Sequence, residues 1–193
     1  MARQTGRRQK RGIIPTLIGA GITERMYFTH LCSLFGYRMR IQPHFFGTES
    51  IDGLNKKIKD VLSNEGYAIV VFDADVSTWD AAEKAKLDKM RRDFSDNDNV
   101  LLCDSLPSIE YWFLLHYKNT NRHFGTSSEV IKELKKYLKE FDKSQSFLKN
   151  EAWVSEMSGD GKLDDAIARA KAFGTEGGSY SQVFRAIDKI RKH

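Results

Sequence analysis

Two aspartates stand at the end of an apolar segment, and their type and spacing suit the binding of a metal ion. Residues 68–72 are apolar, and Asp73 and Asp75 follow them directly. Such a segment is typical of a central parallel strand, which is covered on both faces. Because strand residues i and i+2 point to the same side, about 6–7 Å apart, the two carboxylates can converge on one cation as the chain turns away. Carboxylate oxygens suit Mg²⁺ or Mn²⁺, which also accept phosphate oxygens, so the pair indicates a metal site for phosphate chemistry.

The same two aspartates have a second interpretation that needs no metal. Aspartate often caps the start of a helix, and Asp75 is placed to cap one that begins after residue 77. Two neighbouring carboxylates also repel each other, and one tends to take up a proton unless a cation neutralises the pair. The motif therefore leaves open both a metal site and a plain helix cap.

The elements around the motif alternate between strand and helix patterns. Strand segments are apolar or alternating, whereas helix segments carry apolar residues at a spacing of three and four. This alternation predicts an α/β protein with a doubly wound, mainly parallel four-stranded sheet. The expected strands are 12–19, 37–44, 67–73 and 99–105, and the expected helices are 23–36, 50–66, 80–94 and 107–117.

The chain changes character after residue 118. The last third, 119–193, shows only helical patterns, and Tyr180, Ser181 and Gln182 are expected to open its final helix. We therefore expect an α/β core over 12–118 with a helical C-terminal region packed on it. Residues 1–11 are expected to form a basic flexible arm.

Charge and composition narrow the class of protein. The net charge is +5, and five basic residues crowd the first eleven positions, so this arm is expected either to touch phosphates or only to aid solubility. No stretch is long and apolar enough to span a membrane, and two cysteines without metal spacing suit a reduced cytoplasm. The glycines at 19 and 21 lack the Lys-Ser/Thr ending of a P-loop, which argues against an NTPase. The five basic residues are Arg3, Arg7, Arg8, Lys10 and Arg11.

Four stretches, in this order and spacing, resemble the RloB-like family over nearly the whole chain. They are a Thr-Glu pair followed by Tyr-Phe, the acidic pair, an apolar segment that begins with proline, and the tail 178–190. Each stretch alone is weak, whereas the four together are specific. The matching residues are Thr23, Glu24, Tyr27, Phe28, Asp73, Asp75, Pro107, Glu110, Trp112, Leu114, Leu115 and His116.

This resemblance implies a Toprim-type (topoisomerase–primase) α/β domain and a cytoplasmic role in phage defence. The family is found with restriction–modification and abortive-infection loci of bacteria, commonly beside an AAA-type ATPase. It implies a Mg²⁺- or Mn²⁺-dependent nuclease acting on RNA or DNA, with Asp73 and Asp75 as metal ligands. Toprim-type sites add a glutamate at the end of the first strand, and that position falls on Gly19 here. Glu24 is the first candidate to supply the missing carboxylate, and Glu110 is the second.

Two other classes of function stay open. The chain could be a catalytically weak or inactive Toprim-like module that binds nucleic acid or a partner, as Gly19 suggests, or a metal-free structural domain. The role of Glu110 also stays open, since instead of acting near a metal it could satisfy backbone donors or bind a basic side chain at a helix start. His116 is expected to be a core histidine rather than a ligand. The expected partners are nucleic acid and an ATPase, and a homo-oligomer is kept as an alternative.

Overall fold

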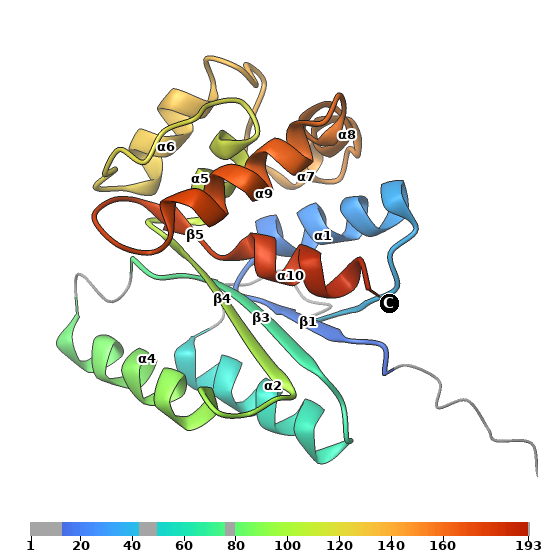
Figure 1. Cartoon of the computed structure of the whole chain (residues 1–193), viewed down its shortest axis with the longest axis vertical. Helices are drawn as coiled ribbons and strands as arrows, with labels where there is room; N and C mark the ends of the chain where they lie inside the picture. Colours follow the sequence, from blue (N-terminus) through green and yellow to red (C-terminus); the bar gives the residue numbers. More distant parts are fainter. Residues whose placement is uncertain (1–12, 43–49, 76–79, 193) are drawn as a thin grey trace, which may run out of the picture.

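The chain folds around one five-stranded sheet in the computed structural model, which describes residues 13–42, 50–75 and 80–192 (Figure 1). The strand order is β2-β1-β3-β4-β5, and β1 to β4 are parallel. β5 is antiparallel to β4. The prediction of a mainly parallel α/β sheet is confirmed, whereas the predicted number of four strands is wrong. The strands are β1 (Thr16–Gly19), β2 (Arg40–Gln42), β3 (Ala68–Asp73), β4 (Val100–Leu106) and β5 (Tyr180–Ser181).

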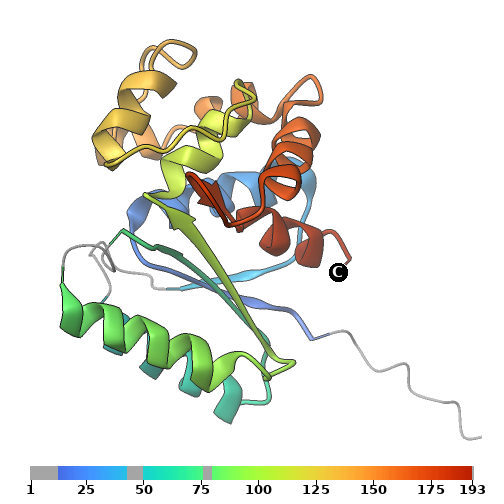
Figure 2. The ribbon, with the colours of Figure 1, turned by 60° about the vertical axis from the view of Figure 1, so that its left-hand side comes forward.

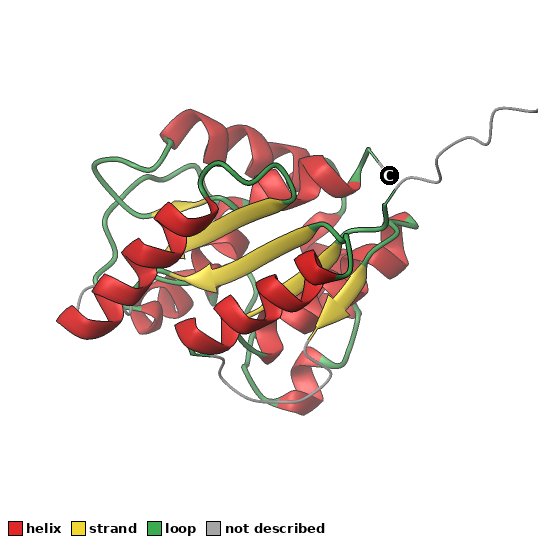
Figure 3. Ribbon diagram, turned by 90° about the horizontal axis from the view of Figure 1, so that it is seen from below, coloured by secondary structure: helices red, strands yellow, loops and turns green. Residues whose placement is uncertain are grey.

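Helices cover both faces of the sheet. Figure 1 and Figure 2 place α2 and α4 together on one face and the other helices on the opposite face. Figure 3, seen from below, shows α2 and α4 crossing in front of the strands. The helices are α1 (Ile22–Phe35), α2 (Ile51–Ser63), α4 (Ala81–Phe94), α5 (Ile109–Leu115), α6 (Ser127–Leu134), α7 (Gln145–Leu148), α8 (Ala152–Ser158), α9 (Lys162–Phe173) and α10 (Val183–Ile190).

The central strand β3 is buried on both sides, as its composition predicts. Ile69 and Val71 face the larger apolar cluster, which lies under α1 and α5. Val70 and Phe72 face the smaller cluster, which is closed by α2 and α4. The C-terminal helices α6 to α10 contribute side chains to the larger cluster, so the last third of the chain packs on the same face as α1. A strand held from both sides in this way fixes the position of Asp73 at its end.

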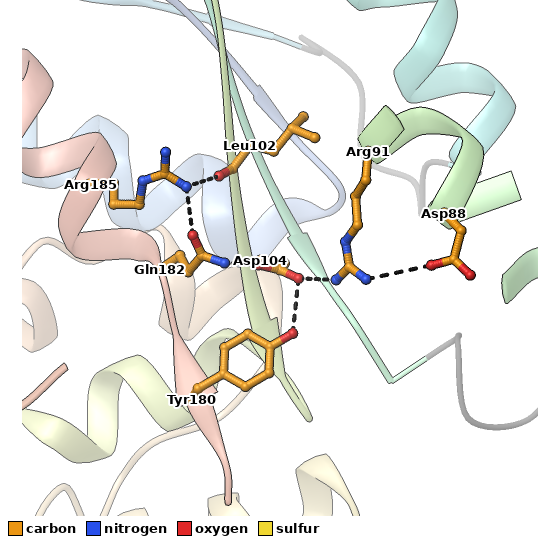
Figure 4. A network of polar contacts seen from close by, with 7 residues as sticks. All are labelled: Asp88, Arg91, Leu102, Asp104, Tyr180, Gln182 and Arg185. Carbon is orange, nitrogen blue, oxygen red and sulfur yellow. Dashed lines mark hydrogen bonds and ion pairs between the residues drawn. The ribbon is translucent and has the colours of Figure 1, made fainter. Parts of the chain in front are cut away.

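Strand β5 joins the sheet through a buried aspartate on β4 (Figure 4). The Asp104 carboxylate accepts hydrogen bonds from Tyr180 Oη at 3.0 Å and Gln182 Nε2 at 2.8 Å, and forms an ion pair with Arg91 of α4. The backbone N–H of Gln182 also donates to the Asp104 carbonyl at 2.8 Å. The expectation that residues 180–182 open the last helix is therefore wrong for Tyr180 and Ser181. A strand of two residues is too short to show the alternation that predicts a strand, and its partners lie far away in the sequence.

Several local predictions are corrected by the backbone. Helix α1 begins at Ile22 and ends at Phe35, one residue earlier at each end than the expected range 23–36. Helix α4 is capped by Asp80, which accepts from the N–H groups of residues 82 and 83, whereas residues 76–79, where Asp75 is expected to cap a helix, lie outside the described residues. Strand β2 covers only part of the expected range 37–44, whose last two residues lie outside the described residues, as does the arm 1–11.

Candidate functional site

A cleft of about 750 Å³ lies at the carboxyl ends of the parallel strands. It is lined by the four acidic residues that the sequence singles out, namely Glu24, Asp73, Asp75 and Glu110. Asp73 ends β3, Glu24 lies in the first turn of α1 after β1, and Glu110 lies in the first turn of α5 after β4. Because β1, β3 and β4 are parallel neighbours, their carboxyl ends meet at one edge, where ligands bind in open α/β sheets. The fold thus brings together residues that are far apart in the sequence.

Asp73 is oriented by a backbone group at the start of α5. Its Oδ1 accepts a hydrogen bond from the N–H of Ile109 at 2.9 Å, which ties the end of β3 to the start of α5. Burial raises the pKa of Asp73 well above its usual range, and the nearby carboxylates of Glu24, Glu110 and Asp75 raise this pKa further. The cleft therefore disfavours the ionised form of Asp73.

Glu24 occupies the space beside the glycine that replaces the expected carboxylate. A Cβ atom added to Gly19 would lie 3.1 Å from the Cβ of Glu24, and one added to Gly21 would lie 3.1 Å from Glu24 Oε2. The Glu24 side chain, which is only 4% exposed, thus lies over the backbone of both glycines. Gly19 is an ordinary strand residue outside the left-handed region. A glycine therefore suits this position because it leaves room for Glu24, and not because of the backbone conformation. A side chain at position 19 would require Glu24 to shift by a few tenths of an ångström.

The environment of Glu24 disfavours its negative charge. Burial raises the pKa of this carboxyl from 4.5 to about 7, and the charge of Glu110 adds to the effect. Hydrogen bonds from the backbone N–H groups of Glu24 and Gly21 oppose it only in part, as does the charge of Lys143. A cation bound in the cleft would favour the ionised form of Glu24.

Glu110 is fully buried; its Oε2 accepts a hydrogen bond, whereas its Oε1 forms an ion pair but no hydrogen bond among the described residues. Ser108 Oγ donates a hydrogen bond to Oε2, and Lys143 Nζ lies 2.8 Å from Oε1. The interpretation that Glu110 binds a basic side chain thus agrees with the structure. Lys143 lies between α6 and α7, in the C-terminal third, and sequence reasoning missed it. It is one of many lysines in that segment, so no local signal distinguishes it.

The donor set fits a hard divalent cation by its chemistry, although it is not assembled around one. Among the described residues, no three His, Cys, Asp or Glu side chains form a group that could hold a metal ion as they stand. The carboxylates of Glu24, Asp73 and Asp75 nevertheless line one cleft and are oxygen ligands of the kind that Mg²⁺ and Mn²⁺ prefer. Coordination would require these side chains to rotate toward a common point, which a cation's charge would favour.

His116 lies outside this cleft. Its Nδ1 donates to the Trp112 carbonyl at 3.0 Å, and its ring packs edge-on against the Trp112 ring. Burial lowers the pKa of His116 to about 3, and its Nε2 finds no hydrogen-bond partner among the described residues. The side chain is a neutral core histidine, as expected, with one of its two nitrogens unsatisfied.

In the part of the chain that the structure describes, no helix has both the length and the apolar character needed to cross a membrane.

Comparisons with known proteins place the chain in a family. Searches of curated proteins and of solved structures found no match. The family model described as RloB-like protein matches residues 17–190, which include every lining residue of the cleft. With a match over most of its length, the chain belongs to the RloB-like family.

Proposed function

We propose that this protein is a Toprim-type nuclease that uses Mg²⁺ or Mn²⁺ to cleave phosphodiester bonds in RNA or DNA. The observation that carries the proposal is the convergence of Glu24, Asp73 and Asp75 on one cleft at the carboxyl ends of parallel strands. The family resemblance adds the biological setting, which is cytoplasmic defence against phage alongside an AAA-type ATPase partner.

Each carboxylate has a distinct part in this proposal. Asp73 and Asp75 hold the cation, and the Ile109 N–H orients Asp73 for this task. Glu24 supplies the third carboxylate from the first turn of α1, in the space that a side chain at position 19 would otherwise fill. The bound cation would hold the scissile phosphate and stabilise charge on the leaving oxygen. Glu110, engaged by Ser108 and Lys143, shapes the cleft wall.

A second candidate function is a binding module that recognises nucleic acid without cutting it. The observation that favours it is Gly19, which removes a carboxylate from the position where Toprim-type chemistry has one. In this case Glu24 would only cap α1 and fill space beside the glycines. The two candidates differ in whether Glu24 is needed for a measurable reaction.

The deciding experiment incubates the purified protein with tRNA, single-stranded DNA and duplex DNA, in Mn²⁺ and in EDTA. We expect cleavage only in Mn²⁺ and its loss in the Asp73→Asn/Asp75→Asn variant and in Glu24→Gln. The chain offers a matched control, Asp96→Asn/Asp98→Asn, which alters an exposed Asp-x-Asp pair outside the cleft.

Each outcome separates the candidates. Cleavage that survives in the control but not in the cleft variants supports the nuclease. Binding of nucleic acid without cleavage by the wild type supports the binding module. Equal Mn²⁺ binding by the wild type and the Asp73→Asn/Asp75→Asn variant would rule out the metal site.

A further inference from the structure

The cleft contains a positive charge that the nuclease proposal does not use. Lys143 Nζ lies 2.8 Å from Glu110 Oε1, and its side chain is 45% exposed whereas that of Glu110 is fully buried. One end of the pair is therefore fixed inside the protein, and the other stands at the wall of the cleft. The C-terminal third supplies this lysine, together with Gln145, to a cleft whose other lining residues all lie before the end of α5.

The ammonium group of Lys143 interacts with more than its direct partner. Burial alone would lower the pKa of Lys143, but the charges of Glu110, Asp73 and Glu24 outweigh burial and raise it. The lysine stays protonated and partly offsets the negative charge of the cleft. The same carboxylates would attract a divalent cation bound at Asp73 and Glu24. The lysine and the cation therefore compete for one set of negative charges.

We propose that Lys143 is the resident counter-ion of the cleft, which keeps Glu110 out of the cation's ligand set and thereby limits the affinity for a divalent cation. This inference rests on the proposed metal site. Lys143 is a positioning residue in this account, since it acts through Glu110. Removing Lys143 should strengthen cation binding, which is the opposite of what is expected when a lysine with a purely structural role is removed.

The pair gives four variants with different expected affinities. Lys143→Met removes the competing charge and frees Glu110 Oε1 toward the cleft, so Mn²⁺ should bind about tenfold more tightly than to the wild type. Glu110→Gln leaves the lysine charge without its partner, so Mn²⁺ should bind more weakly. The Glu110→Gln/Lys143→Met variant removes both charges and should bind Mn²⁺ about as the wild type does. Lys139→Met is the matched control, since Lys139 is an exposed lysine of the same segment that does not line the cleft.

The measurement is a calorimetric titration of Mn²⁺ into each full-length variant without nucleic acid. The unfolding free energy is measured in parallel in EDTA, because a buried carboxylate that has lost its partner can destabilise the folded protein. If Lys143→Met does not fold, the comparison of Glu110→Gln with the double variant still decides the question. The double variant should bind Mn²⁺ more tightly than Glu110→Gln.

The outcomes distinguish this inference from the proposed function. Wild type and Lys143→Met that bind Mn²⁺ with equal affinity would overturn the counter-ion role while leaving the metal site intact. A wild type that binds no Mn²⁺, together with a Lys143→Met variant that does, would support the counter-ion role strongly. If neither binds Mn²⁺, both the metal site and the role of Lys143 fail.

Discussion

Positions 19 and 24 share one space, and exchanging their side chains tests the origin of the third carboxylate. In Gly19→Glu, the new Cβ would lie 3.1 Å from the Cβ of Glu24. Carbon atoms in favourable contact lie about 3.5–4.0 Å apart, so the two side chains must separate by several tenths of an ångström. Overpacking of this kind typically costs roughly 1–3 kcal/mol. A further carboxylate also adds charge to a cleft that already raises the pKa of Glu24 to about 7.

The assays are urea unfolding at pH 8 in EDTA and cleavage of nucleic acid in Mn²⁺. Gly19→Ala carries the steric cost alone, and Gly19→Glu should be less stable than Gly19→Ala because it adds a charge. We expect Gly19→Glu to add little cleavage, since it displaces Glu24 rather than joining it. The Gly19→Glu/Glu24→Ala variant keeps the Cβ–Cβ contact but removes the second carboxylate, so its stability should return to about that of Gly19→Ala. A Gly19→Glu variant as stable as the wild type and more active would refute the claim of shared space.

Three further predictions follow from the electrostatics of the buried groups. The folded-state pKa of Glu24 is raised from 4.5 to about 7, so its contribution to stability is lost as the pH rises through this range. Glu24→Gln should thus raise the unfolding free energy at pH 8 in EDTA by up to about 3 kcal/mol, with little change at pH 4. The folded-state pKa of His116 is lowered from 6.5 to about 3, so stability should fall as the pH drops between these values, and urea unfolding of His116→Phe should lose this dependence. Asp104→Asn should weaken the anchoring of β5 by about 1–3 kcal/mol, measured as faster hydrogen exchange around Gln182, and unchanged exchange would contradict the role of Asp104.

The sequence predicted the parallel part of the sheet and the place of the acidic pair, because both depend on local patterns. Residues 68–72 are apolar at every position, which requires cover on both faces, and both apolar clusters contact β3 as expected. The parallel arrangement follows from the alternation of strands and helices, and it brings the strand ends together at one edge. The candidate positions of Asp73 and Asp75 in the cleft followed from these two facts alone.

Only the tertiary structure decided which groups surround that pair. The contact of Glu24 with Gly19 depends on how α1 leaves β1, and the pairing of Glu110 with Lys143 depends on where the connection between α6 and α7 packs. Strand β5 is set by Asp104 and by a hydrogen bond between Ser105 and Ser181, which are 76 residues apart. Contacts of this kind produce no periodic pattern in the sequence, because each depends on one residue and on the packing of a distant segment. The sequence therefore determined where carboxylates gather, and the packing of the C-terminal third determined which positive charge meets them.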